Sequence, residues 1–435
     1  MVIFLRTVVA LAIAGLIALL AVIFVPQRTT PPQETLAADW RPARGAGEYV
    51  MRLADCAACH TADDGKPFAG GRPIESPLGT IYSSNITPDP DHGIGQYTLD
   101  EFRAALVDGV RQDGAHLYPA MPYENYRMLR EEDIRALYAY FMEEVAPVPV
   151  APPATDLPFP FDQRWGIRMW NRVALGDPGF HPRLGDALLD RGAYLAEAPG
   201  HCGACHSPRN AAMAQAGLRA GDPGFLEGGE IDGWSTPPLT GPRSAIAGWT
   251  MDDLKLLLAS GRNDHAAVLG EMRLVIEEST QYWSEGDLAA ISAYLLELNR
   301  DAPRREAPAG AVDATAALLT AAVNLPTGAR LYLDNCNACH FVRGQGADQV
   351  FPELAGSSLV TAPKPTGLID VILEGSALPS TSLRPYRLKM PGFAARLSDV
   401  EVAELASFVR SAWGNDAGAV TADEVRAHRE KLAAE

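Results

Sequence analysis

The pentapeptide Cys56-Ala57-Ala58-Cys59-His60 decides how this chain folds, because its pattern of C-x-x-C-H recurs twice further along the sequence. A C-x-x-C-H sequence is typical of haem c attachment, in which both thiols bond to the haem vinyl groups and the histidine is the proximal iron ligand. The three copies use all 6 cysteines of the chain. The pattern predicts covalent attachment of three haems through Cys56, Cys59, Cys202, Cys205, Cys336 and Cys339, with His60, His206 and His340 as iron ligands.

Two other uses of a C-x-x-C pair are half of a zinc site and a thioredoxin-like redox pair. Each copy here is followed directly by histidine, and no further cysteine is present to complete a tetrahedral zinc site. The threefold repetition therefore favours haem attachment over both alternatives.

The distal iron ligand decides the chemistry, because an open iron binds oxygen or peroxide whereas a His/Met iron suits one-electron transfer. Met121, Met272 and Met390 occupy comparable places, each shortly before the last amphipathic stretch of its repeat. We expect these three to be the distal ligands. Other side chains that compete for this role are Met128, Met251, His92, His116, His201 and His265.

The copies of the motif mark three sequence repeats, which we place at residues 40–147, 162–300 and 325–415 and call the first, second and third repeats. Segments rich in proline or alanine, at 146–160 and 301–326, separate them as linkers. A repeat of ~100 residues buries little apolar surface by itself, so each is expected to be a small helical bundle completed by haem. Residues 416–435 are charged and form an expected polar C-terminal tail.

Each repeat ends in a predicted amphipathic helix that carries an aromatic residue on its apolar face, at helical spacing from an aliphatic residue. These aromatic residues are Tyr140, Tyr294 and Phe408. Ser284 and Ser398 stand three residues before an acid, which predicts helix N-caps. Arg130 occupies the same place in the first repeat and cannot cap in that way.

The N-terminal segment, residues 1–30, contains 18 uninterrupted apolar residues from Val8 to Val25. Such a run is long enough to span a bilayer and longer than the apolar core of most cleaved signal peptides. The alternative is cleavage after Thr35-Leu36-Ala37, a poor match to a small-x-small site. We expect a single-pass anchor in the bacterial cytoplasmic membrane, with the haem domains in the periplasm, where haem c is attached.

The amino-acid composition and net charge limit the classes of partner that this chain is expected to bind. The chain has 435 residues and a net charge of −17, with no basic stretch that would displace counterions from a nucleic acid. We therefore expect no nucleic-acid partner, and any docking patch on a protein partner is expected to be basic.

Several longer stretches resemble a known family, the three-haem cytochrome c subunit of membrane-bound bacterial dehydrogenases that oxidise alcohols, aldehydes, sugars or sugar acids. The stretches that carry this resemblance are residues 79–89, 93–95, 113–114, 118–123, 191–195, 207–210, 279–282 and 412–415. The resemblance implies an all-α fold of three tandem class I cytochrome c-like domains behind an N-terminal transmembrane helix. It places the iron ligands on His60, Met121, His206, Met272, His340 and Met390.

The resemblance also implies a function without a catalytic site in this chain. Such a subunit accepts electrons from a separate catalytic subunit of molybdenum, flavin or quinoprotein type and passes them through its haems to membrane ubiquinone. Because the apolar segment is N-terminal, the resemblance slightly favours the aldehyde-oxidising complexes whose catalytic subunit contains molybdenum. The alternatives are an oxidase-linked or free-standing electron carrier and, with less support, a multi-haem peroxidase that keeps one iron open.

Overall fold

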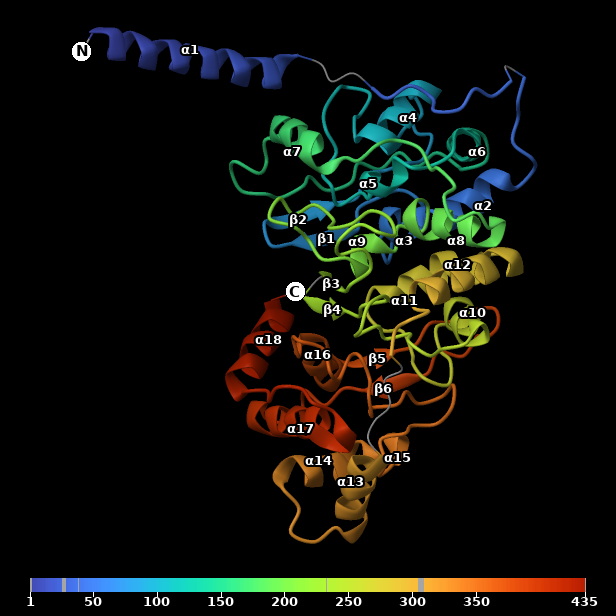
Figure 1. The fold of residues 1–435 in the computed structure, drawn as a ribbon, viewed down its shortest axis with the longest axis vertical. Helices are drawn as coiled ribbons and strands as arrows, with labels where there is room; N and C mark the ends of the chain where they lie inside the picture. The colour runs from blue at the N-terminus through green and yellow to red at the C-terminus, as the bar shows by residue number, and fades with distance from the viewer. Residues whose placement is uncertain (1, 26–28, 38, 232, 304–308, 435) are drawn as a thin grey trace. The chain divides into compact units, whose positions relative to one another are not determined.

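The computed structural model describes residues 2–25, 29–37, 39–231, 233–303 and 309–434 (Figure 1). The chain divides into two compact units, and each is described by itself. Unit 1 comprises Met1–His181, Glu197–His201 and Arg209–Leu218, and unit 2 comprises Pro182–Ala196, Cys202–Pro208 and Arg219–Glu435.

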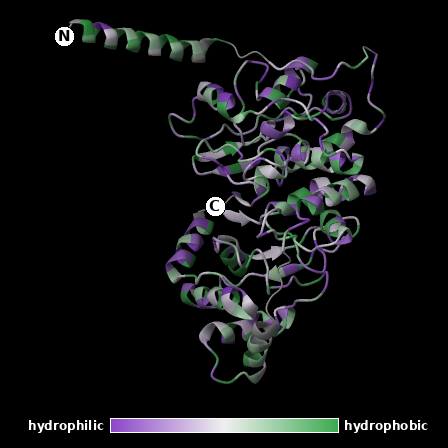
Figure 2. Ribbon diagram, viewed as in Figure 1, coloured by the Kyte–Doolittle hydropathy of each residue, from purple (hydrophilic) through white to green (hydrophobic). Residues whose placement is uncertain are grey.

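Unit 1 contains the first repeat and the apolar N-terminal helix, which Figure 2 shows to be dominated by hydrophobic residues. Segment 197–201 belongs to this unit because the Asn125 amide donates to the Glu197 carbonyl and the Tyr126 ring packs edge-on against His201. The elements of the unit are α1 (Val2–Phe24), α2 (Ala46–Leu53), α3 (Cys56–His60), β1 (Pro73–Ser76), β2 (Gly79–Tyr82), α4 (Leu99–Asp108), α5 (Tyr123–Tyr126), α6 (Glu131–Glu143), η1 (Arg164–Gly166) and α7 (Ile167–Ala174).

Unit 2 contains most of the second repeat and all of the third. Its helices are α8 (Ala187–Glu197, whose last residue lies in unit 1), α9 (Gly203–His206), α10 (Met251–Ser260), α11 (Met272–Leu274), η2 (Val275–Ser279), η3 (Thr280–Tyr282), α12 (Glu285–Leu298), α13 (Ala309–Ala321), α14 (Thr327–Asn335), α15 (Asn337–His340), α16 (Thr366–Glu374), α17 (Asp399–Ser411), η4 (Ala412–Gly414) and α18 (Ala422–Ala434). Its strands are β3 (Gly229–Ile231), β4 (Trp234–Thr236), β5 (Gly375–Ala377) and β6 (Lys389–Pro391).

The described residues are rich in helix, as the sequence predicts, but they also form three antiparallel strand pairs: β1 with β2, β3 with β4, and β5 with β6. These pairs are short, between three and four residues per strand. The expectation of an all-α fold therefore needs this correction. The pairs β1–β2 and β3–β4 follow α3 and α9 along the chain, and β6 contains Met390.

The same helix crossing occurs in each repeat, between the helix before the C-x-x-C-H motif and the last helix. A glycine on the first helix lies so close to the second that an added Cβ would meet a backbone carbonyl oxygen and the Cβ of an aromatic residue. The contacts are Gly47 with Ala136 O (2.3 Å) and Tyr140, Gly192 with Ala290 O (2.1 Å) and Tyr294, and Gly328 with Glu404 O (2.3 Å) and Phe408. Only glycine permits this approach, since it has no side chain to separate the two backbones.

The predicted last helices are confirmed as α6, α12 and α17. Their aliphatic residues Leu137, Ile291 and Leu405 are buried, which places the aromatic face towards the core. Ser284 and Ser398 are N-caps, each accepting a hydrogen bond from the backbone N–H three residues on.

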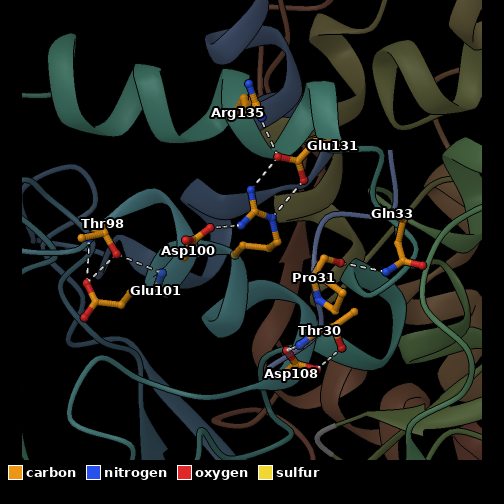
Figure 3. Close-up of polar contacts among 10 residues, drawn as sticks. Thr30, Pro31, Gln33, Thr98, Asp100, Glu101, Asp108, Glu131 and Arg135 are labelled. Carbon is orange, nitrogen blue, oxygen red and sulfur yellow. Dashed lines mark hydrogen bonds and ion pairs between the residues drawn. The ribbon is translucent and has the colours of Figure 1, made fainter. Parts of the chain in front are cut away.

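Helix α6 begins differently, as the sequence predicts, because its N-cap residue Arg130 makes no side-chain cap. Three acids occupy the first turn instead, and they complement the helix dipole. Glu131 is buried and accepts hydrogen bonds from Arg103 and from Arg135 one turn later, at 3.0 Å from Arg135 Nε (Figure 3). The buried carboxylate is thus paired on both sides, and the helix start is fixed by tertiary contacts.

The third repeat has its own apolar core around Trp413, whose side chain is fully buried. The Trp413 ring packs edge-on against Tyr332, and its indole N–H donates to the Val342 carbonyl. Cys336 and Met390 are partly buried and pack against this same core. The Cys336 thiol and the Met390 thioether, both predicted to bind the third haem, therefore lie against the same apolar cluster.

Two segments without a predicted helix are helical. Within the expected linker 301–326, α13 packs against η4, and its Thr315 hydroxyl accepts a hydrogen bond from Trp413 N. Within the expected polar tail, α18 packs on α16 and α17 with Val425 fully buried. Both helices cover apolar surface of the third repeat.

Candidate haem sites

The three C-x-x-C-H motifs lie on short helical turns, α3, α9 and α15. None of the six cysteines forms a disulfide, so the two cysteines of a motif are not joined to each other. Burial raises the pKa of Cys202 and of Cys336 to about 12 and raises that of Cys56 further. The first thiol of each motif is thus a neutral, partly buried thiol, beside a second thiol one helical turn away.

The three motif histidines are oriented in the same way, although the residues around them differ. Nδ1 of each ring lies at hydrogen-bond distance from a backbone carbonyl: His60 at 2.7 Å from Ser84 O, His206 at 2.8 Å from Pro237 O, and His340 at 3.0 Å from Pro352 O. A carbonyl can only accept, so Nδ1 carries the proton and Nε2 is left with its lone pair. A second-shell carbonyl of this kind fixes a metal-binding histidine.

The Nε2 atoms of these histidines make no hydrogen bond or ion pair with any residue that the structure describes. Burial lowers the pKa of His60, His206 and His340, and this favours the neutral imidazole, the form that binds a metal. Each ring therefore presents a neutral, correctly protonated nitrogen donor.

The candidate methionines are all partly buried but sit in different local structures. Met121 lies in the bend before α5, Met272 begins α11, and Met390 lies in β6. Met390 is held by its register, because it pairs with Ser376 across the strands and its carbonyl comes within 2.3 Å of the Cβ position of Gly375, which has a φ of +79°. By contrast Met128, a competing methionine, is 2% exposed and belongs to the core.

The competing histidines are engaged by other side chains. His116 is buried, with Arg168 Nε donating to its Nε2 at 3.1 Å. His265 stacks on Trp249 and lies 3.5 Å from Asp253. His201 packs against Tyr126, and burial lowers its pKa to about 4. His92 is exposed on the surface. These contacts favour methionine as the distal ligand over histidine.

The donor set present in each repeat fits haem c. It consists of two thiols one helical turn apart that form no disulfide, a neutral imidazole oriented by a carbonyl, and a partly buried thioether. Among the described residues no group of three or more His, Cys, Asp or Glu side chains is placed to hold a metal ion, so a protein-only metal site of the zinc type has no support there.

One buried acid near the first site was not singled out by the sequence. Glu124, three residues after Met121, is 4% exposed and accepts a hydrogen bond from Gln215 N at 3.3 Å. Burial raises its pKa to about 7, although Arg209 at 3.8 Å and the Gln215 N–H act in the opposite direction. Its tyrosine-rich neighbourhood gave no sequence signal for a buried acid.

We expect Glu124 to make stability fall as the pH rises. Its pKa is higher in the folded chain than the ordinary value of 4.5, so the stability is fully present below pH 4.5 and declines as Glu124 ionises up to about pH 7. Glu124→Gln is expected to remove this slope, with a difference of up to about 3 kcal/mol at neutral pH. The measurement is thermal unfolding of both proteins across this pH range. The exposed Glu132→Gln serves as the matched control, and an unchanged slope in Glu124→Gln would contradict the assignment.

Comparison with known proteins agrees with this geometry. A family model described as cytochrome c matches residues 326–413. The cytochrome c subunit of alcohol dehydrogenase (quinone) from Gluconobacter oxydans (strain 621H) is 45% identical over 386 residues, which cover 87% of this chain and 80% of the relative. This chain belongs to the family of dehydrogenase cytochrome c subunits.

Other members of this family serve different dehydrogenases. The gluconate 2-dehydrogenase cytochrome c subunit of Pantoea cypripedii is 43% identical over 392 residues, covering 88% of both chains. The fructose dehydrogenase cytochrome subunit of Gluconobacter japonicus is 38% identical over 421 residues, covering 92% of this chain and 85% of the relative. As a dehydrogenase cytochrome c subunit, the chain is an electron-transfer protein that binds haem c covalently and has a catalytic dehydrogenase subunit as its partner.

Proposed function

We propose that this cytochrome c subunit carries three haems and passes electrons from a catalytic dehydrogenase subunit to membrane ubiquinone. The observation that carries the proposal is the threefold recurrence of a C-x-x-C-H turn whose histidine donates Nδ1–H to a backbone carbonyl. Haem c, when bound, supplies an iron that cycles between two oxidation states one electron apart. The protein around it attaches, orients and insulates that iron.

Each repeat contributes one complete ligand set. The thiols of Cys56 and Cys59, Cys202 and Cys205, and Cys336 and Cys339 hold the haems, while His60 with Met121, His206 with Met272, and His340 with Met390 ligate iron. A His/Met iron has no open position, which opposes oxygen or peroxide chemistry and suits electron transfer. In this proposal the repeats 40–147, 162–300 and 325–415 act as three class I cytochrome c-like domains.

The substrate is oxidised on the other polypeptide. The relatives' names refer to alcohol, gluconate and fructose dehydrogenases, so an alcohol, an aldehyde, a sugar or a sugar acid is the substrate class we propose for the complex. The partner is then a quinoprotein, flavin or molybdenum subunit. The quinone in the name of the alcohol dehydrogenase supports ubiquinone as the acceptor.

We propose that α1 anchors the protein in the cytoplasmic membrane, with the haem domains in the periplasm. Residues Ile3–Ala21 are long and apolar enough to cross a membrane and are 0% buried in the fold, a test that a signal sequence also passes. The chain after α1 is fastened to the first repeat, since the N–H and hydroxyl of Thr30 both donate to Asp108 at 2.7 Å (Figure 3). Attachment through α1 would hold the first repeat close to the bilayer.

The test is purification of the chain from native membranes in mild detergent, with intact mass, haem content and co-purifying subunits measured together. We expect a mass equal to the polypeptide plus three haems, an uncleaved N-terminus, and a large flavin, quinoprotein or molybdenum subunit. Replacing both Cys336 and Cys339 with alanine should leave two haems. A mass with fewer than three haems in the unaltered chain would overturn the haem count.

The same preparation separates the alternatives. Recovery with copper-haem oxidase subunits, or without any partner, would favour an oxidase-linked or free-standing carrier. Carbon monoxide binding to the reduced protein at nearly one molecule per haem would favour a peroxidase with open irons. Little or no carbon monoxide binding is expected, because a methionine occupies each distal position.

A further inference from the structure

One arginine of unit 2 is buried without a partner. Arg262 is only 8% exposed, and its Nε and Nη1 atoms are both buried and make no hydrogen bond. In the described part of the chain no carboxylate forms an ion pair with this guanidinium. Arginine is charged at any physiological pH, so its charge cannot be removed by deprotonation.

Arg262 lies in the loop between α10 and α11, and α11 begins with the candidate iron ligand Met272. It follows Gly261, the residue that ends α10, and forms a bridge with Ala267 in the loop that leads to Met272. In the third repeat the residue that follows the helix-ending Gly375 is Ser376, and Ser376 pairs directly with Met390. Arg262 in the second repeat therefore corresponds to Ser376 in the third, the residue that pairs with the candidate iron ligand Met390.

A second cation lies near Arg262. Burial lowers the pKa of Arg262, and charge repulsion from Arg384, in the loop before β6, lowers it further. Arg384 itself donates to the backbone and side chain of Gln349 in the third repeat. The two loops are packed together, because an added Cβ on Gly261 would come within 2.4 Å of Pro379.

A buried guanidinium whose Nε and Nη1 lack partners, and which a second cation repels, is unfavourable unless an anion binds it. An isolated buried charge costs several kcal/mol, and a planar guanidinium binds a carboxylate through two parallel hydrogen bonds. The ligand required here is thus a carboxylate that the polypeptide does not supply.

We propose that Arg262 binds a haem propionate. This inference rests on the proposed function, because it requires haem in unit 2. The propionate belongs to the haem of either the second or the third repeat, since Arg262 lies on the loop of Met272 and Arg384 on the loop before Met390. The arginine neutralises the propionate charge and thereby raises the potential of that haem, because a negative charge nearby favours ferric iron.

The test replaces Arg262 with methionine, which has similar length and no charge, in the full-length protein. If the propionate is bound, Arg262→Met lowers the reduced-to-oxidised ratio of one haem by roughly tenfold at a fixed potential and lowers the thermal midpoint. If Arg262 has no ligand, removing an unpaired buried charge raises the thermal midpoint and shifts no haem potential. The thermal midpoint therefore falls if the propionate is bound and rises if Arg262 has no ligand. Arg262→Lys, which keeps the charge, should leave the haem potential close to that of the unaltered protein.

Potentiometric titration in two marked backgrounds identifies the haem. Met272→His or Met390→His lowers the potential of one haem and so separates its titration from those of the other haems. Adding Arg262→Met to each background should then shift the potential of the haem of the second repeat or of the third. A shift confined to the first haem, or none, overturns the proposal. Arg300→Gln is the matched control, because Arg300 is exposed and paired with Glu297. Three haems retained in Arg262→Met with no shift would refute the propionate contact and leave the proposed function intact.

Discussion

Replacement of Met390 with alanine is expected to open the iron of the third repeat while the other two haems stay six-coordinate. The methionine sulfur raises the haem potential, and axial ligands set haem potentials over a span of about 0.8 V. We therefore expect the potential of one haem to fall by on the order of hundreds of millivolts. Loss of one methionine-to-iron signature in low-temperature magnetic circular dichroism, with carbon monoxide binding to one haem in three, measures the effect.

The effect should be local because Met390 packs against the core of the third repeat, the cluster that contains Trp413 and Tyr332. Met251→Ala provides the control, since Met251 is another partly buried methionine of unit 2 and begins α10. It should change neither the carbon monoxide binding nor any potential. If Met390→Ala leaves every haem potential unchanged, the distal ligand of the third repeat is a different residue.

The features that can be predicted from this sequence are those that depend on residues close together in the chain. The C-x-x-C-H turns, the apolar faces that carry Tyr294 and Phe408, and the N-caps Ser284 and Ser398 all depend on local spacing. Local spacing also holds a signal for α18, because Thr421 and Glu424 close a reciprocal cap at its start. The alanine-rich run of α13 favours a helix in the same way, through propensity.

The parts that sequence could not give depend on pairs of residues far apart in the chain. Glu124 becomes a buried acid only when segment 209–218 folds over it. The unpaired state of Arg262 depends on which groups surround it, and Arg384 comes from another repeat. The carbonyl that orients each motif histidine lies 12 to 31 residues away, and this separation differs in every repeat. No spacing rule connects such partners.

The glycine crossing leads to the prediction with the largest expected effect on stability. Gly328 on α14 lies against the backbone of α17, and an added Cβ would come within 2.3 Å of Glu404 O and 2.7 Å of the Phe408 Cβ. Neither atom is the mobile end of a side chain, so Gly328→Ala must move one helix. Overpacking of this kind costs about 1–3 kcal/mol, and Gly328→Val should cost more.

We expect the loss to appear first at the third haem, because α14 leads directly into the turn that carries Cys336 and His340. Thermal unfolding followed at the haem absorption band should show one of three transitions moving down by several degrees, with the other two unchanged. Gly418→Ala is the control, since a Cβ there meets nothing within 4 Å. The same substitution at Gly47 or Gly192 should lower the transition of its own repeat, whereas an Ala at Gly328 that is as stable as the unaltered chain would contradict the close crossing. A shift of all three transitions together would instead mean that the repeats unfold as one cooperative body.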